Sequence, residues 1–161
     1  MICSVACFAQ TASIDFVIKN LGINVDGHFN TFTITTTFDS ENSLKSVSGE
    51  IEVKSIKTGI KSRDEHLLEE DYFHISKYPK IYLISTQVIK RTANLYDVKV
   101  ELKIKGKTKQ FSIPIKVDDT EESRKITSNF EINRKDFGVG GSSFVMSKTV
   151  KLNVLHVQKK Q

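Results

Sequence analysis

Apolar and polar residues alternate with a period of two along most of this chain. In residues 98–104, for example, Val98 and Val100 are separated by Lys99. The same alternation occupies residues 14–18, 32–38, 47–53, 111–117, 126–132 and 150–154, and a further extended segment follows Pro79. Strands with one apolar and one polar face are typical of antiparallel sheets that pack one face on a core. Eight such strands predict an all-β domain, either a sandwich or a barrel.

Turn-forming residues separate the predicted strands. Asp39–Asn42 and Gly106-Lys107 are expected to form hairpin connections, and residues 118–125 a charged loop. A flexible turn is predicted at residues 138–141, which include three glycines. At 161 residues the chain suits one domain, and it contains no internal repeat, low-complexity tract or linker. We therefore expect a single domain over residues 11–158.

One short helix is predicted to interrupt the strands. Ser62 and Glu65 fit a capping box, in which Ser62 caps free backbone amides and Glu65 reaches back from the third helical position. Asp64 and Glu65 also place negative charge near the positive end of the helix. Pro79 then forces extended backbone on Tyr78 and begins the next strand.

The net charge raises the question of an acidic partner. The formal charge is +5 and the pI is about 9.1. Most lysines, such as Lys99, Lys103 and Lys105, alternate singly with apolar residues, so we interpret them as a solvated outer face with protected edges. We expect no nucleic-acid partner. A weak contact with anionic headgroups at a membrane surface is compatible with this charge.

Residues 1–10 resemble the end of a secretory signal peptide. Ile2–Ala9 is small and apolar and ends in Cys7-Phe8-Ala9, with small residues at the two positions that the peptidase reads. A charged start and a full apolar run are missing, so we expect a truncated signal-peptide-like leader; a frayed terminus is the alternative. Cys3 and Cys7 are the two cysteines, so we expect no disulfide and no thiolate metal site in the folded domain.

The sequence contains no constellation of residues that points to catalysis. The four histidines, at positions 28, 66, 74 and 156, lack the spacing of zinc ligands. Gly140-Gly141-Ser142-Ser143 lacks the Gly-x-Ser-x-Gly frame of a nucleophile elbow. The acidic residues fall on loops or outward faces, where no apolar pocket forces two carboxylates together. We expect a protein that is not an enzyme and that needs no metal or cofactor.

Ten short motifs, taken in order, resemble the YceI-like family of small bacterial barrel proteins. The resemblance covers residues 14 to about 157. Its motifs are Ile14-Asp15-Phe16, Val25-Asp26-Gly27-His28-Phe29, Phe38-Asp39, Ser55-Ile56-Lys57-Thr58, Arg63-Asp64-Glu65-His66-Leu67, Tyr72-Phe73, Tyr78-Pro79-Lys80-Ile81, Ser85-Thr86, Ile104-Lys105-Gly106-Lys107-Thr108-Lys109 and Asn133-Arg134-Lys135-Asp136-Phe137-Gly138. The resemblance implies a lipocalin-like antiparallel barrel of eight strands, in the periplasm or secreted, in the bacterial cell envelope. It also implies that the interior carries a polyisoprenoid, an isoprenoid quinone or another long-chain amphiphile, without catalysis.

The residues expected to face the barrel interior are apolar, so they could surround an alkyl or prenyl chain. The predicted lining consists of Phe16, Phe32, Ile34, Phe38, Val100, Leu102, Phe111, Ile113, Phe130, Ile132 and Phe144. An eight-stranded barrel is just wide enough to fill with side chains or to hold one slender ligand. Plain core packing is therefore the alternative role for each of these residues.

Several polar residues are candidates for the mouth of the barrel. Arg63, Asp64 and His66 lie on the helical break, where they could bind a quinone, hydroxyl or phosphate headgroup. Their structural alternative is helix capping and a local ion pair that fastens the helix to the barrel. Arg134 and Asp136 are predicted to form an ion pair at a strand end, and a place at the mouth of the barrel is the alternative.

Two other functions stay open from the residues alone. One is a ligand-free barrel whose lysine-rich outer faces bind protein partners or the membrane surface. The other is a small oligonucleotide-binding barrel, which only the basic pI favours, because the expected exposed aromatic platform is missing. The sequence also leaves open whether the protein is a monomer or a homodimer.

Overall fold

A computed structural model describes residues 11–141 and 143–160 of the chain. The predicted leader over residues 1–10, with Cys3 and Cys7, lies outside the described residues. In chain order the elements are β1 (Ala12–Asn20), β2 (Ile23–Phe29), β3 (Phe32–Phe38), β4 (Leu44–Glu52), the 3₁₀ helix η1 (Val53–Ser55), β5 (Ile56–Lys57), α1 (Lys61–Leu67), β6 (Lys80–Lys90), β7 (Leu95–Ile104), β8 (Lys107–Asp119), β9 (Ser123–Asn133), the 3₁₀ helix η2 (Arg134–Phe137) and β10 (Met146–Lys159). The prediction of an all-β domain with one short α-helix is confirmed.

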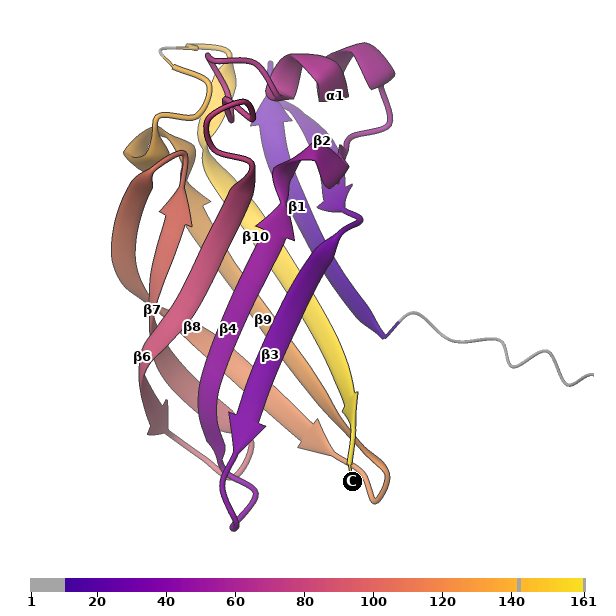
Figure 1. Cartoon of the computed structure of the whole chain (residues 1–161), viewed down its shortest axis with the longest axis vertical. Coiled ribbons are helices and arrows are strands. Elements are labelled where there is room, and N and C mark those ends of the chain that lie inside the picture. Colours follow the sequence, from indigo (N-terminus) through magenta and orange to yellow (C-terminus); the bar gives the residue numbers. More distant parts are fainter. Residues whose placement is uncertain (1–10, 142, 161) are drawn as a thin grey trace, which may run out of the picture.

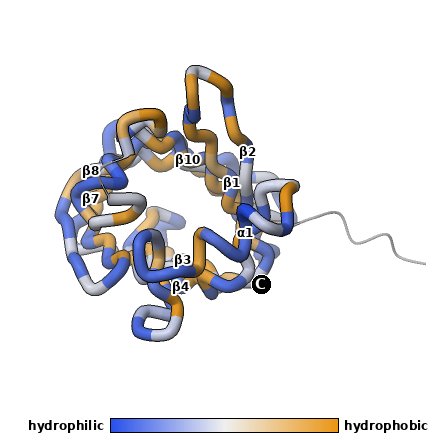
Figure 2. Tube along the Cα trace, turned by 90° about the horizontal axis from the view of Figure 1, so that it is seen from above, coloured by the Kyte–Doolittle hydropathy of each residue, from blue (hydrophilic) through white to orange (hydrophobic). Residues whose placement is uncertain are grey.

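All ten strands belong to one antiparallel sheet that curls around a central axis (Figures 1 and 2). Their order is β3-β4-β6-β7-β8-β9-β10-β1-β2-β5, so the sheet has two ends, β3 and β5. The expectation of a closed eight-stranded barrel is therefore wrong, both in the number of strands and in closure. Strand pairing depends on contacts far apart in the sequence, which alternation within one strand does not report.

Side chains hold the curl together where no backbone ladder is present among the described residues. Thr36, on the edge strand β3, donates a hydrogen bond of 2.6 Å to Oε1 of Gln158 on β10. The guanidinium of Arg124, on β9, lies 4.1 Å from the centre of the Phe38 ring on β3. Cation–π and hydrogen-bond contacts of this kind cover the exposed edge of β3 at its lower end.

The two strands that the sequence did not predict are β2 and β5. In β2 an inward position is occupied by Gly27, which hides the alternation between Val25 and Phe29. A Cβ atom at Gly27 would lie 2.2 Å from Cζ of Phe16, so the Phe16 ring occupies the space that a side chain there would need. Strand β5 has only two residues, too few for any period to show.

Both predicted hairpins are present. Lys105 and Gly106 connect β7 to β8 with φ angles of 50° and 76°, the left-handed pair that a two-residue type I′ turn requires. Between β3 and β4, the Asp39 carboxylate accepts hydrogen bonds from the backbone N–H groups of Glu41 and Ser43, each at 2.9 Å. These two bonds lower the pKa of Asp39.

The capping box predicted for α1 is wrong. The helix begins at Lys61, with Ile60 at the N-cap and no side-chain cap, so Ser62 lies within the first turn. Instead, Asp64 reaches back and accepts hydrogen bonds from the backbone N–H and the hydroxyl of Thr58, at 2.8 and 2.6 Å. The carboxylate thus fastens the helix to the strand that precedes it.

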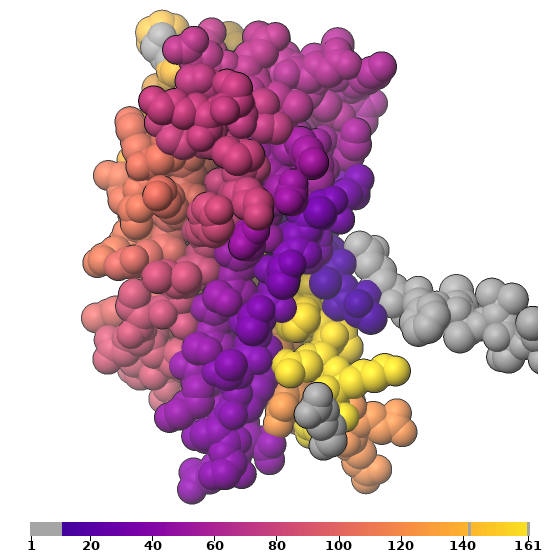
Figure 3. Space-filling model, viewed as in Figure 1, coloured from indigo at the N-terminus to yellow at the C-terminus, as the bar shows by residue number. Residues whose placement is uncertain are grey.

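The inner face of the sheet holds two apolar clusters. The upper cluster, toward the end that carries α1, centres on Phe16, Phe29, Val53, Leu102 and Phe137. The lower cluster includes Val98 and Val100, both 0% exposed, together with Tyr96 and Ile115. Residues 60–78 cover the upper end of the molecule, as the space-filling view shows (Figure 3). Within the described residues, no helix has the length and apolar character needed to cross a membrane.

Candidate functional site

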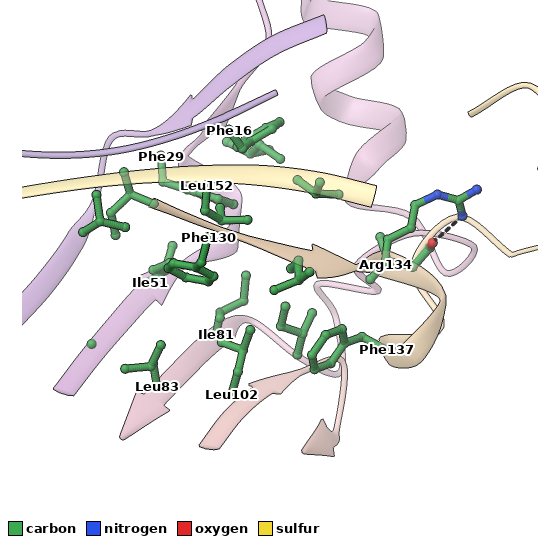
Figure 4. Close-up of a pocket in the computed structure, with 18 of the residues that line it drawn as sticks. Phe16, Phe29, Ile51, Ile81, Leu83, Leu102, Phe130, Arg134, Phe137 and Leu152 are labelled. Atoms are coloured by element: carbon green, nitrogen blue, oxygen red, sulfur yellow. Dashed lines mark hydrogen bonds between the residues drawn. The ribbon is translucent and has the colours of Figure 1, made fainter. Parts of the chain in front are cut away.

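An apolar cavity of about 230 Å³ lies inside the curled sheet. Its walls are mostly aliphatic and aromatic side chains from all ten strands, and those drawn in Figure 4 point toward one another. Among them are Ile14, Phe16, Phe29, Ile34, Ile51, Ile81, Leu83, Leu102, Ile113, Ile126, Phe130, Ile132, Phe137, Val150, Leu152 and Val154. Such a wall offers an extended hydrocarbon a dry environment.

The lower apolar cluster closes one end of the cavity. Ile113, Ile115 and Ile126 belong to that cluster and also line the cavity, so they form its floor. Val98 and Val100 of the same cluster are fully buried and lie outside the cavity lining. A chain inside the cavity would therefore stop at this floor, and its other end would lie toward α1.

Six of the eleven residues predicted to face a ligand line the cavity: Phe16, Ile34, Leu102, Ile113, Phe130 and Ile132. Four others pack beside it. Val100 lies in the lower cluster, and the Phe111 ring packs against that of Phe130 at 6.0 Å. Phe32 packs against the upper cluster, and Phe38 packs against the lower cluster beneath Arg124.

The predicted inward position of Phe144 is wrong. Its side chain is 97% exposed, because residues 143–145 leave the sheet before β10 begins at Met146. The alternation seen further along β10 therefore does not extend back to Phe144.

Of the predicted mouth residues, Arg63 lines the cavity, and Asp64 and His66 do not. Arg63 donates to the Thr58 hydroxyl at 2.7 Å and to the Thr58 carbonyl at 2.6 Å. Together with the Asp64 bonds, these contacts fasten α1 to the sheet. His66 is turned toward solvent, where Nδ1 lies 3.0 Å from a carboxylate oxygen of Glu69.

Arg134 is a buried charged residue of the cavity wall, and sequence reasoning misjudged its role. It is only 3% exposed. Its N–H groups donate to five backbone carbonyls, those of Val139 (2.8 Å), Gly141 (3.4 Å), Ser143 (3.2 Å), Met146 (2.9 Å) and Ser147 (2.8 Å). Figure 4 draws Arg134 with one of these bonds.

The predicted ion pair of Arg134 with Asp136 is wrong. Asp136 is exposed on η2, and Arg134 forms no salt bridge with any described residue. Burial lowers the pKa of Arg134, and the nearby Tyr72 partly opposes that shift. A guanidinium has five N–H donors, and each of them has a carbonyl partner here, so Arg134 holds residues 139–141 and 143–147 in place.

The upper end of the cavity is covered by a cap, by which we mean α1, residues 68–78 and residues 138–141. Gly140 joins the two parts of the cap, since its N–H donates to the carbonyl of Asp71 at 2.9 Å. Lys105 also joins them, because its ammonium donates to the carbonyls of Glu70 (2.7 Å) and Gly138 (3.0 Å). A Cβ atom at Gly140 would lie 2.9 Å from Nη1 of Arg134, so only glycine fits there.

The cap contributes apolar residues that the predicted lining did not include. Leu67, Tyr72, Phe73 and Val139 line the cavity from above. Tyr72-Phe73 follows the helix without a recognisable period, so alternation gave no signal for these side chains. The motif that contains Phe29 was noted in the sequence, but its Gly27 obscured the strand.

His156 is a titratable residue of the cavity wall, on β10. Burial lowers its pKa from the usual 6.5, so the imidazole is more readily neutral than one in water. Within the residues that the structure describes, no group of three or more His, Cys, Asp or Glu side chains could hold a metal ion.

Comparison with known proteins identifies the fold and its relatives. The YceI-like domain matches residues 8–157. A UPF0312 protein of Pectobacterium atrosepticum is 37% identical over 111 residues, which cover 68% of this chain and 55% of that protein. The chain thus matches about half the length of that relative. A UPF0312 protein of Vibrio cholerae is 28% identical over 159 residues, covering 92% of this chain and 82% of that protein.

Among the solved structures that share the fold are two bacterial proteins. Burkholderia cenocepacia BcnA superposes with a TM-score of 0.86 at 23% identity, covering 91% of this chain and 96% of that one. A polyisoprenoid binding domain from Saccharophagus degradans gives a TM-score of 0.73 at 16% identity, covering 95% and 97%. Identities this low show a common fold and carry no residue-level correspondence.

Proposed function

The chain belongs to the YceI-like domain family, and on that premise we propose that it binds one long-chain amphiphilic lipid in its cavity and carries it without catalysis. The lipid is a polyisoprenoid or an isoprenoid quinone. The observation that carries this proposal is the continuous apolar wall of the 230 Å³ cavity. The Saccharophagus domain with the same fold, described as polyisoprenoid binding, supports the choice of lipid.

The mechanism is partition of the hydrocarbon tail from water into the cavity. Each methylene group buried there contributes about 0.8 kcal/mol, so a dozen carbons would provide tight binding. The tail reaches down to the floor formed by Ile113, Ile115 and Ile126, and the head stays below the cap. Specificity then comes from the length and thickness of the tail more than from polar contacts.

Release of the lipid requires the cap to move. The two parts of the cap are joined by the Gly140 bond and the two Lys105 bonds, each worth about 1 kcal/mol. Few hydrogen bonds therefore need to break for the two parts of the cap to separate. The bacterial cell envelope, periplasmic or secreted, is the setting that we propose for this cycle.

Native mass spectrometry of the purified protein, followed by organic extraction of whatever dissociates, tests the proposal. A single extra mass that extracts as a prenyl or acyl chain supports the carrier function and names the lipid class. A bare protein mass, together with no uptake of added isoprenoid quinone or fatty acid, would contradict it. That result would favour a filled barrel that binds protein partners instead.

A further inference from the structure

Half of the large exposed hydrophobic side chains in the described residues gather at one place. These are Leu21 (71% exposed), Ile23 (70%), Phe144 (97%) and Val145 (52%), which we call the hairpin patch. Of the others, Tyr82 and Ile84 share the outer face of β6, Leu95 begins β7, and Ile60 precedes α1. An apolar group of this kind is unfavourable in water, so it calls for a partner.

The hairpin patch joins two segments far apart in the sequence. The backbone N–H of Leu21, at the tip of the β1–β2 hairpin, donates to the carbonyl of Val145 at 2.9 Å. One position further in, Asn20 pairs with Met146. β1 rises to the same end of the molecule as α1, and β10 begins there (Figure 1).

The patch is continuous with the cavity. Asn20 and Met146 both line the cavity wall, and they are the direct neighbours of Leu21 and Val145 in the chain. A hydrocarbon that leaves the cavity past these two residues therefore meets apolar side chains on the outside. The exposed group therefore lies directly beside the cavity wall.

The backbone conformation at the tip of the β1–β2 hairpin is unfavourable for the leucine at position 21. Leu21 has a φ of 52° and Gly22 a φ of 76°, the left-handed pair of a type I′ turn. That turn favours Asn or Asp at its first position, because a branched apolar side chain is strained there. An exposed leucine in this conformation helps neither folding nor solubility, so an external function explains it better.

Positive charge flanks the patch. Lys19 and Lys148 lie next to it on β1 and β10, both exposed, and neither forms a salt bridge with any residue that the structure describes. The nearest strand partner of Lys19 is the uncharged Asn24. Free ammonium groups beside an apolar tip match an anionic lipid surface, in which phosphates lie above hydrocarbon.

We infer that the hairpin patch inserts into an anionic lipid bilayer while Lys19 and Lys148 contact lipid phosphates, and that the carried lipid passes there between bilayer and cavity. The patch exposes roughly a few hundred Å² of apolar surface, the size of a local apolar patch. A stable protein interface buries about 800 Å² per partner. A bilayer accepts a small projecting tip, whereas a protein partner or a second copy would need a larger surface around it.

Vesicle flotation of the protein tests this inference, with phosphatidylcholine vesicles and with mixed phosphatidylcholine and phosphatidylglycerol vesicles. The key variant combines Leu21→Asn with Phe144→Ser. Asn-Gly is the preferred type I′ sequence, so Leu21→Asn is expected to keep or raise the melting temperature. Ile84→Thr, an exposed apolar residue on the outer face of β6, is the matched control.

We expect the wild type to float with the anionic vesicles and the double variant to bind at least about tenfold more weakly, with an unchanged fold. Lys19→Gln and Lys148→Gln should each weaken binding by about fivefold on anionic vesicles only. Ile84→Thr should bind as the wild type does.

Equal binding by the double variant and the wild type, or no binding of the wild type to either vesicle, would overturn the inference. A change of oligomeric state in the double variant, with vesicle binding retained, would assign the patch to a second copy. Insertion of the hairpin patch stands apart from lipid carriage, whereas passage of the lipid at the patch rests on the proposed function, and the two fail separately. Lipid content is measured by extraction from protein without vesicles, whereas flotation reports the patch.

Discussion

Gly49 offers a way to fill the cavity without disturbing the fold. It lies on β4 between Ile34 of β3 and Leu83 of β6, and all three residues line the cavity. A Cβ atom there would meet only Leu83 Cβ and the Thr33 carbonyl, at 4.0 and 3.9 Å, which are ordinary contacts. Larger side chains at this position therefore extend into the space that we assign to the lipid tail.

The expected cost to binding follows from the carbons that are displaced. Gly49→Ile adds four carbons, so it should weaken lipid binding by about 3 kcal/mol, or roughly 200-fold, at about 0.8 kcal/mol per carbon. Gly49→Ala and Gly49→Val, with one and three added carbons, should fall between on a logarithmic scale. Stability should rise by about 0.5–1 kcal/mol, since glycine weakens a strand.

The assay is binding of a fluorescent prenyl or acyl lipid to delipidated protein, with the melting temperature measured in parallel. Thr35→Ile adds apolar volume to the same sheet on the outer face and should leave binding unchanged. A flat series, in which folded Gly49→Ile binds lipid as tightly as the wild type, would refute the assignment of this cavity to the tail.

Three further substitutions test other parts of the structure. Arg134→Met should lower the free energy of unfolding by about 3 kcal/mol or more in denaturant unfolding, because buried carbonyls lose their donors. Arg134→Lys should keep part of the wild-type stability, since an ammonium has three donors for the five carbonyls. Gly27→Ala should destabilise by about 1–3 kcal/mol through its clash with the Phe16 ring, and adding Phe16→Leu should relieve most of that loss in a double-mutant cycle. Because the pKa of His156 is lowered in the folded protein, the unfolded chain binds a proton there more readily, and stability should fall as the pH drops below about 6.5. His156→Gln should flatten this dependence in melting curves recorded between pH 7.5 and about 5.5. An unchanged slope of melting temperature against pH would exclude His156 as its source.

The period-two alternation predicted which side chains face inward but not how far along the axis they lie. Val100 and Leu102 share one face of β7, yet Val100 is buried in the lower cluster and Leu102 borders the cavity. Their difference depends on where the curled strands meet, which is a property of the whole sheet. Alternation also gave no prediction of β2. Its inward position 27 is a glycine, because the Phe16 ring occupies the space of a side chain there.

The roles of the charged residues were harder to predict. Sequence reasoning gave Arg134 a nearby carboxylate partner, Asp136, because opposite charges two positions apart suggest an ion pair. In the structure, Arg134 donates to backbone carbonyls of the residues that follow η2. Every residue has a backbone carbonyl, so the sequence does not indicate which ones will accept. The inward placement of Phe144 failed for a different reason: the glycines at 138–141 suggested that the turn ends before residue 144, whereas β10 begins only at Met146.

The packed lower cluster has a consequence for the life of the protein between cargoes. A carrier must persist empty, and a hollow chain whose folding depended on its cargo would unfold or aggregate after delivery. Here Val98, Val100 and Tyr96 are buried in the lower cluster and do not line the cavity, so this part of the hydrophobic core is complete without any lipid. The lower cluster thus stabilises the fold, and the upper cavity selects the lipid. Substitutions around the upper cavity can change which lipid is held while the lower half keeps the chain folded.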